Sequence, residues 1–335
     1  EPYRRQRQMC IRDRSKNYFT EHVGERVLAP TWGGYKDMKE IPLSLSYLQE
    51  AKRAGMKITP LLHNDFDLQE TKKLLHDSGA VQNLARQITA TALVYDFDGW
   101  NLDFENMDEA DKFLYTKFIK TVSEKLHMHG KEISVDITVN SNSPNWSLCY
   151  DRKGMAAYVD YEVIMGYDQT PGGSRYSGPV SSYSWLKHHI AMLLKQVPNN
   201  KLVLGLPFYT RIWTGKEGQV ASSVLMMKQI KSLLGQNNIG LFWNPEDRQY
   251  VGIWEENGQT RKVWFEERRS LQEKVSLAHD YKLAGLAFWR YGFETEDIYD
   301  QIEGAFLNKK DESVRYKNRS EDILIKFRER LKRAQ

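Results

Sequence analysis

The stretch Asp98-Gly99-Trp100-Asn101-Leu102-Asp103-Phe104-Glu105 alternates strictly between apolar and polar side chains from its third residue onward. In a β-strand, this alternation places the polar residues from Asn101 to Glu105 on one face and the bulky apolar residues on the other. The carboxyls of Asp103 and Glu105 then lie ~6–7 Å apart along the strand. Like charges this close resist joint ionisation, so one carboxyl is pushed toward its protonated form and can act as a general acid near neutral pH. The stretch therefore predicts a strand that carries acid catalysis, with an ordinary amphipathic strand as the alternative.

The composition is that of a globular chain with a large core. The 335 residues are 41% hydrophobic and 27% charged, and one large domain is expected. The 48 Lys and Arg nearly balance the 44 Asp and Glu, so the net charge of +4 does not point to nucleic acid. Cys10 and Cys149 stand alone, without a metal-spaced His and Cys cluster, and no apolar run approaches the ~20 residues of a membrane span. We therefore expect no cofactor, no metal, no nucleic-acid partner and no integral membrane segment.

Short β-like runs alternate with amphipathic helical stretches along the chain. The candidate strands are Arg26–Trp32, Lys57–His63, Gly99–Glu105, Glu132–Asn140, Tyr161–Tyr167, Lys201–Phe208 and Gly285–Trp289. The helical segments between them include Leu43–Gly55, Val81–Val94, Glu109–Gly130, Tyr183–Gln196 and Leu271–Tyr281. This repetition of strand and helix is typical of a parallel sheet with crossover helices.

Two α/β architectures share this pattern, a doubly wound sheet and a (β/α)8 TIM barrel. No glycine-rich phosphate loop follows an early strand, and polar residues gather at the carboxyl ends of many different strands, which favours the barrel. Residues 212–265 interrupt the repeat. A helix is expected near Val224–Leu234, and Asn257-Gly258 between two β-like runs indicates a hairpin. We predict a small α+β insertion before the last helix and strand, forming one wall of a cleft.

Four motifs follow one another at the ends of predicted strands. They are Phe97–Glu105, Met165-Gly166-Tyr167-Asp168, Leu204–Tyr209 and Gly285–Trp289. Together they resemble the fourth, sixth, seventh and eighth strands of glycoside hydrolase family 18, the chitinase-like (β/α)8 barrels. Phrases such as Leu62-His63-Asn64 and Val263-Trp264-Phe265-Glu266 are similar to the spore-germination branch, the cortical-fragment-lytic N-acetylglucosaminidases. The resemblance covers about residues 24–306 and implies retaining hydrolysis of β-linked N-acetylglucosamine in peptidoglycan or chitin-like glycans.

The resemblance also implies roles for single residues. In substrate-assisted catalysis the 2-acetamido group of the sugar replaces an enzyme nucleophile. Glu105 would be the general acid, Asp103 would hold the acetamido N–H, and Tyr167 would bond to the acetamido oxygen. Asp98 and Asn101 would support Asp103 from below, with Asn101 as a neutral relay where many chitinases have Asp. Asp168 would bind substrate hydroxyls beside Tyr167, and Trp289 would form the floor under the cleaved sugar, with a core aromatic as the alternative for Trp289. The other substrate-binding candidates, each with a core or supporting role as its alternative, are Tyr209, Arg211, His63 and Asn64.

The amino-terminal residues depart from the family pattern. Glu1–Lys16 is basic and lacks the alternation of a barrel's first strand, and Gln8–Arg14 looks like a translated sequencing-adapter fragment. We expect a non-native or disordered arm over residues 1–16, a first strand lost by truncation, a catalytic barrel over residues 17–308 and a charged helical tail over residues 309–335. A natural basic arm is the alternative. The barrel would then be open between its first and last predicted strands.

Two other function classes fit parts of the sequence. A chitinase-like barrel without activity would be a carbohydrate-binding lectin, but such proteins lack the acid, whereas Glu105 and Asp103 are both present here. A nucleic-acid or membrane binder could use the basic ends, but acidic residues are interleaved in the tail. We expect a monomeric glycosidase whose partner is a glycan containing N-acetylglucosamine, located outside the cytoplasm in the cell wall or spore envelope.

Overall fold

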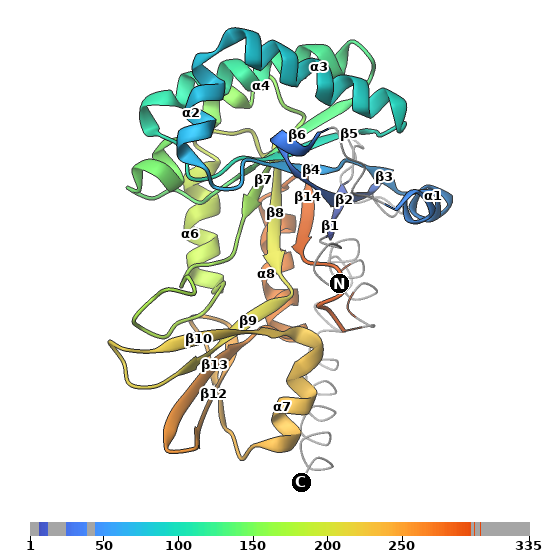
Figure 1. Cartoon of the computed structure of the whole chain (residues 1–335). Helices are drawn as coiled ribbons and strands as arrows, with labels where there is room; N and C mark the ends of the chain where they lie inside the picture. Colours follow the sequence, from blue (N-terminus) through green and yellow to red (C-terminus); the bar gives the residue numbers. More distant parts are fainter. Residues whose placement is uncertain (1–6, 13–24, 39–43, 296–297, 299–301, 303–335) are drawn as a thin grey trace.

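The computed structural model of the chain describes residues 7–12, 25–38, 44–295, 298 and 302 (Figure 1). Its larger sheet has the strand order β1-β14-β8-β7-β6-β5-β4-β2-β3, and β1 also pairs with β2, so that the sheet closes on itself. A second, antiparallel sheet has the order β10-β9-β13-β12-β11. In Figure 1 this second sheet lies at the lower end of the molecule, next to α7 (Ile230–Gln236). The predicted TIM barrel with an insertion is therefore confirmed.

Eight strands of the barrel run parallel in the part of the chain that the structure describes. They are β2 (Glu25–Gly34), β3 (Lys57–Ile58), β4 (Leu61–His63), β5 (Gly99–Asp103), β6 (Glu132–Ile137), β7 (Tyr161–Met165), β8 (Leu202–Pro207) and β14 (Gly285–Trp289). The predicted strand Lys57–His63 is split into β3 and β4 at Thr59-Pro60, because proline has no N–H to donate to a ladder. All predicted strands are present with slightly different ends.

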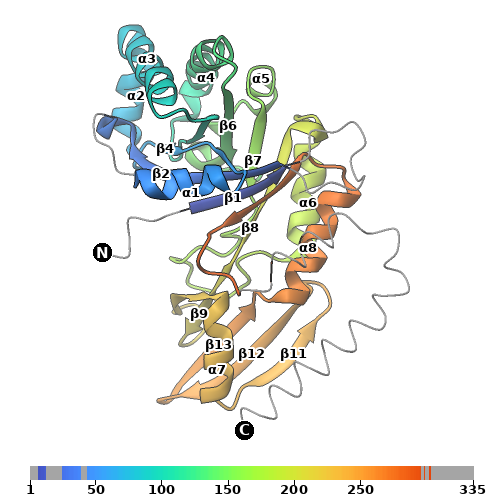
Figure 2. The same cartoon turned by 90° about the vertical axis from the view of Figure 1, so that its right-hand side faces the viewer.

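The helices of the barrel lie on its outside (Figure 2). They are α1 (Leu45–Arg53), α2 (Leu68–His76), α3 (Ser78–Val94), α4 (Lys112–His127), α5 (Arg152–Met155), α6 (Tyr183–Leu193) and α8 (Arg268–Asp280). α2 was not predicted, because it is short and mostly polar, and it buries only Thr71, Leu74 and Leu75. Its start is fixed by Asp67, whose carboxylate accepts the N–H of Glu70 at 3.0 Å.

The apolar face of β5 packs against these helices. Trp100, Leu102 and Phe104 are fully buried. The indole N–H of Trp100 donates to a backbone carbonyl of α3 at 2.9 Å, and the ring centroids of Phe104 and Tyr115 lie 5.7 Å apart. Burying a large apolar side chain contributes roughly 1.5–3 kcal/mol to folding. This packing fixes the orientation of β5 and turns its polar face toward the inside of the barrel.

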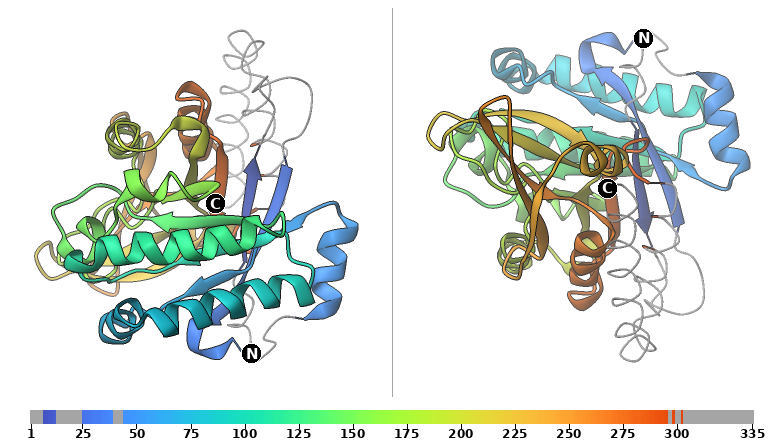
Figure 3. Two further views of the ribbon diagram at one scale, coloured as in Figure 1. Left: turned by 90° about the horizontal axis from the view of Figure 1, so that it is seen from above. Right: turned by 90° about the horizontal axis from the view of Figure 1, so that it is seen from below.

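The expected gap in the barrel is filled, which corrects the prediction for part of the amino-terminal arm. Residues 7–12 form β1 (Arg7–Arg12), which pairs antiparallel with both β2 and β14 (Figure 3). A parallel strand is usual in this place. The pairing satisfies backbone groups that two open edges would leave without partners, which is why a strand can form here despite the unfavourable sequence pattern. Residues 1–6, residues 13–16 and the predicted tail over 309–335 lie outside the described residues.

The insertion begins where β8 ends and is mainly a β-sheet. Its strands are β9 (Tyr209–Thr214), β10 (Ala221–Met226), β11 (Gly240–Asn244), β12 (Gln249–Glu256) and β13 (Gln259–Phe265). The predicted hairpin is confirmed, since β12 and β13 are joined by Asn257 and Gly258 with positive φ angles of 52° and 73°. The predicted helix Val224–Leu234 is wrong in its first turn. Val224 lies in β10, because antiparallel pairing with β9 outweighs the local preference.

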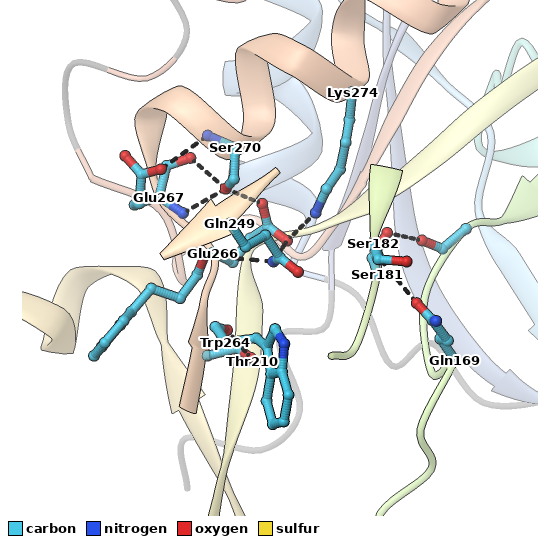
Figure 4. A network of polar contacts seen from close by, with 12 residues as sticks. Gln169, Ser181, Ser182, Thr210, Gln249, Trp264, Glu266, Glu267, Ser270 and Lys274 are labelled. Atoms are coloured by element: carbon cyan, nitrogen blue, oxygen red, sulfur yellow. Dashed lines mark hydrogen bonds and ion pairs between the residues drawn. The ribbon is translucent and has the colours of Figure 1, made fainter. Parts of the chain in front are cut away.

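A buried polar network joins the insertion to α8 (Figure 4). The ammonium of Lys274 on α8 forms an ion pair with Glu266, which follows β13, and both side chains are buried. Glu266 also accepts hydrogen bonds from the Ser270 hydroxyl at 2.6 Å and from the Gln249 amide at 3.2 Å. Buried charges need such partners to offset lost hydration. The network therefore holds the insertion sheet against the last helix of the barrel.

Candidate active site

The polar face of β5 points into the barrel, as predicted. Asn101 lines a small internal cavity of about 10 Å³ together with Ser134 and Val163 of the neighbouring strands. Asp103 is the last residue of β5, and Glu105 follows two residues later. Both are half-buried at the carboxyl ends of the parallel strands, the end at which TIM-barrel active sites lie.

The two carboxyls of Asp103 and Glu105 form a coupled pair. Burial raises the pKa of Asp103 to about 6, and a hydrogen bond with Glu105 opposes this rise. Burial raises the pKa of Glu105 to about 9, and the negative charges of Asp103 and Asp136 add to the effect. Because the carboxyls interact, their protons belong to the pair and not to one residue alone. At neutral pH the pair holds one proton, which the higher pKa of Glu105 favours on that carboxyl, and this arrangement suits a general acid beside a stabilising charge.

Asp136 is a third buried carboxyl at this place, and sequence reasoning missed it. It lies on β6 and accepts a hydrogen bond from the amide of Asn101 at 3.0 Å. Asn101 and Ser134 are register partners, so the next inward-facing positions, Asp103 and Asp136, are neighbours as well. Burial and then the charge of Asp103 raise the pKa of Asp136. The available signal was the strict alternation of β6, in which Glu132, Ser134 and Asp136 share one face and Asp136 lies near the carboxyl end.

The carboxyl ends of β7 and β8 supply a second group of polar side chains. The rings of Tyr167 and Tyr209 meet edge to face, with centroids 6.3 Å apart. The Tyr209 hydroxyl donates to the carboxylate of Asp168 at 2.8 Å, and the guanidinium of Arg211 lies 3.8 Å from the same carboxylate. Burial and then the charge of Asp136 raise the pKa of Tyr167, so its hydroxyl keeps its proton and can donate a hydrogen bond. The negative charge of Asp168 also acts on Glu105, which links the two groups.

The remaining candidates have different surroundings. Trp289 ends β14 and is partly exposed, and its carbonyl accepts the N–H of Phe208 at 2.7 Å. His63 is half-buried beside Asp65, with 3.0 Å between its ring nitrogen and that carboxylate. Asn64 is only 2% exposed and bonds to the backbone of Glu105 and not toward solvent. The structure therefore brings Trp289 and His63 to the strand ends with surface available, and it places Asn64 beneath Glu105.

A family model for glycosyl hydrolases family 18 matches residues 44–294. The chain belongs to this family. Among the described residues of this family 18 chain, no group of His, Cys, Asp and Glu is suited to holding a metal ion. No described helix has both the length and the apolar character needed to cross a membrane. The predicted glycosidase class is thus confirmed at the level of the family.

Several relatives connect this family 18 chain to spore enzymes. The uncharacterized glycosylase YvbX of Bacillus subtilis is 26% identical, and the match covers 76% of each chain. The cortical fragment-lytic enzyme of the same organism is 26% identical over 71% of this chain, but the match spans only 56% of that relative. The crystal structure of the Bacillus cereus spore cortex-lytic enzyme SleL has a TM-score of 0.75 at 21% identity, covering 81% of this chain and 65% of the other. The resemblance to the spore-germination branch is confirmed.

Asp98 is a candidate that the structure places away from the polar cluster at the strand ends. It precedes the first residue of β5, five residues and ~16 Å of strand before Asp103. Strand alternation also turns it to the same side as Trp100, away from the barrel interior. Its carboxylate accepts the backbone N–H of Ile58 at 2.8 Å and so joins β3 to β5 at their amino ends. The expectation that Asp98 supports Asp103 is wrong, and the relay from Asn101 runs to Asp136.

Proposed function

We propose that the chain hydrolyses β-linked N-acetylglucosamine glycosides in peptidoglycan, with retention of configuration and with assistance from the substrate. The observation that carries this proposal is the adjacent carboxyl pair of Asp103 and Glu105 at the carboxyl ends of the barrel strands, where burial and the charge of Asp103 raise the pKa of Glu105. The presence of both carboxyls argues against the alternative, a carbohydrate-binding lectin of the same fold.

Each step of the proposed reaction uses a group in this cluster. Glu105 donates its proton to the glycosidic oxygen while the bond to the anomeric carbon breaks. The acetamido oxygen of the same sugar attacks the anomeric carbon and forms an oxazolinium ion. The carboxylate of Asp103 accepts the acetamido N–H and offsets the positive charge, while the Tyr167 hydroxyl donates to the acetamido oxygen. Glu105, now ionised, takes a proton from the water that opens the ion, so the configuration is retained.

The surrounding side chains bind the sugar in this proposal. Asp168, oriented by Tyr209 and Arg211, accepts hydrogen bonds from substrate hydroxyls. Trp289 presents its ring to the C–H face of the sugar in the cleaved position, where aromatic rings bind well. Asn101 holds Asp136 in place through its amide. His63 lies at the rim and contacts more distant parts of the glycan.

Peptidoglycan is proposed as the substrate because of the relatives. Two of them are named for lysis of the spore cortex or its fragments, and the match to the cortical fragment-lytic enzyme covers 71% of this chain, against 64% for a probable chitinase of Drosophila melanogaster that is 27% identical. Such a substrate places the protein outside the cytoplasm, in the cell wall or spore envelope. A monomer is sufficient because the cluster is built within one chain.

The direct test is to digest peptidoglycan fragments and chitin oligomers side by side and to identify the new reducing end by mass. We expect N-acetylglucosamine at that end, and a muramic residue there would contradict the proposal.

A thiazoline analogue of the oxazolinium ion should inhibit the enzyme competitively. The analogue copies the bicyclic intermediate, and a site built for that intermediate binds it more tightly than the substrate, with ~10²-fold or greater gain. The measurement is the inhibition constant compared with KM for the matching oligomer. A plain N-acetylglucosamine dimer of equal size serves as the control. An enzyme that relied on its own nucleophile would bind both compounds alike.

The activity should have a bell-shaped dependence on pH. As the pH rises through about 9, Glu105 loses the proton that it must donate. As the pH falls through about 6, Asp103 loses the charge that stabilises the intermediate. The rate kcat/KM, measured across this range on one substrate, should therefore be highest between the two values. Activity that rises continuously toward strongly acidic pH, in a protein that stays folded there, would contradict these assignments.

A further inference from the structure

The backbone on both sides of Glu105 is held by side chains. The ladder of β5 ends at Asp103, so the next peptide groups have no partners in the sheet. The side-chain oxygen of Asn64 accepts the N–H of Glu105 at 3.0 Å, and the side-chain nitrogen of Asn64 donates to the carbonyl of Glu105 at 2.8 Å. The Tyr150 hydroxyl donates to the carbonyl of Phe104 at 2.7 Å. Three consecutive backbone groups therefore depend on two side chains.

Both of these side chains are themselves fixed. Asn64 is 2% exposed, and its nitrogen also donates to the hydroxyl of Thr71 on α2 at 2.9 Å. A side-chain amide can donate and accept at once, which neither a carboxylate nor an aliphatic group of this size can do. Tyr150 is buried, and its ring lies edge to face with that of Tyr115, centroids 6.4 Å apart. With its amide hydrogens used inside the protein, Asn64 is not a ligand for substrate.

We infer that Asn64 and Tyr150 are positioning residues that form a clamp on the general acid Glu105 and hold it beside Asp103. The inference rests on the proposed function and deepens it. Without the clamp, the residues after β5 lose their backbone partners, and the carboxyl of Glu105 can turn toward solvent. A misplacement of ~1 Å can lower a catalytic rate by ~10²-fold. Asn64 directly follows β4 and Tyr150 lies in the segment after β6, so together with β5 three separate parts of the barrel converge on one residue.

The first test uses Asn64→Leu and Tyr150→Phe. Asn64→Leu removes both hydrogen bonds to Glu105 at similar volume, and kcat should fall by ~10²-fold with KM changed by less than about threefold. Tyr150→Phe removes a single hydroxyl and should lower kcat by ~5-fold, since one hydrogen bond is worth ~1 kcal/mol. Asn199→Leu is the matched control, because the amide of Asn199 also bonds to a backbone carbonyl, that of Lys282 at 3.1 Å, far from the site. It should retain the kcat of the natural chain.

A second measurement does not depend on activity. The pKa of Glu105, about 9 in the natural chain, can be followed by NMR of carboxyl-labelled glutamate without substrate. The other titratable groups that face Glu105, besides Asp103, are Asp136, Cys149, Tyr150, Tyr167, Asp168 and Tyr209. None of them is changed in Asn64→Leu, yet the pKa should fall toward the ordinary value for glutamate, ~4.3, as the carboxyl gains access to water.

The two measurements separate the clamp from the proposed function. If the natural chain cleaves no glycan but the pKa of Glu105 still falls in Asn64→Leu, the proposed function fails and the clamp stands. If Asn64→Leu does not fold, Tyr150→Phe carries both measurements with a smaller expected change. Folded variants with unchanged kcat and an unchanged pKa of Glu105 would overturn the clamp.

Discussion

Glu105→Gln should abolish hydrolysis while sugar binding remains. The amide keeps the shape of the side chain but has no proton that it can transfer to the glycosidic oxygen, so kcat should fall by ~10²–10⁴-fold. Affinity for an uncleaved oligomer, measured by calorimetry, should stay close to that of the natural chain, because the other binding groups are unchanged. Asp103→Asn should be almost as damaging, because the developing positive charge loses its counter-charge.

The matched control is Glu124→Gln, the same substitution on α4. Its carboxylate is 64% exposed and lies 3.8 Å from Lys120 at the surface. A surface ion pair of this kind is worth ~0–1 kcal/mol, so neither folding nor activity should change measurably. If Glu105→Gln hydrolysed any N-acetylglucosamine glycan with the kcat of the natural chain, the proposed mechanism would be contradicted.

Lys274→Met should destabilise the fold more than any surface substitution. The substitution removes the ammonium and leaves the carboxylate of Glu266 buried without its counter-charge (Figure 4). Breaking a buried ion pair in this way costs ~3–5 kcal/mol, to be measured as the free energy of unfolding in urea at neutral pH. Burial already raises the pKa of Glu266. A buried carboxyl with a raised pKa is better tolerated when protonated, so the loss should shrink as the pH is lowered.

The double variant Lys274→Met, Glu266→Leu separates charge from packing. With both charges replaced by apolar groups of similar size, no uncompensated carboxylate remains, so most of the lost stability should return, less the cost of leaving the Gln249 amide and the Ser270 hydroxyl without Glu266 as acceptor. Equal losses in the single and double variants would mean that packing, and not the ion pair, joins the insertion to α8.

Local patterns in the sequence were sufficient for much of the fold. The strand β5 could be predicted from its alternation because each of its apolar side chains is buried against helices. The turn at Asn257-Gly258 could be predicted because its positive φ angles favour these two residue types. The proximity of Asp103 and Glu105 could be predicted for the same reason, since both lie on one face of one extended segment.

Features that depend on residues far apart in the sequence could not be predicted from local patterns. Asp136 belongs to the site only because β6 lies next to β5, and Asn64 contacts Glu105 across 41 positions of sequence. Asp98 is close to Asp103 in the sequence, but strand alternation turns the two side chains to opposite faces, and Asp98 bonds to the backbone of Ile58 instead. The pairing of β1 with β2 and β14 depends on which backbone edges are left open, and side-chain patterns do not report that.

The raised pKa values of the buried carboxyls bear on the stability of this fold. Folded Glu105 keeps its proton up to about pH 9, whereas the unfolded chain releases it near the ordinary value of ~4.3, so the folded state is disfavoured progressively as the pH rises between these values. Asp136, also with a raised pKa, carries a cost of the same sign. A mutation that replaces the acid with a neutral residue therefore relieves a folding cost at neutral pH. In this fold, replacing Glu105 by a neutral residue such as Gln is therefore expected to raise the free energy of unfolding at neutral pH.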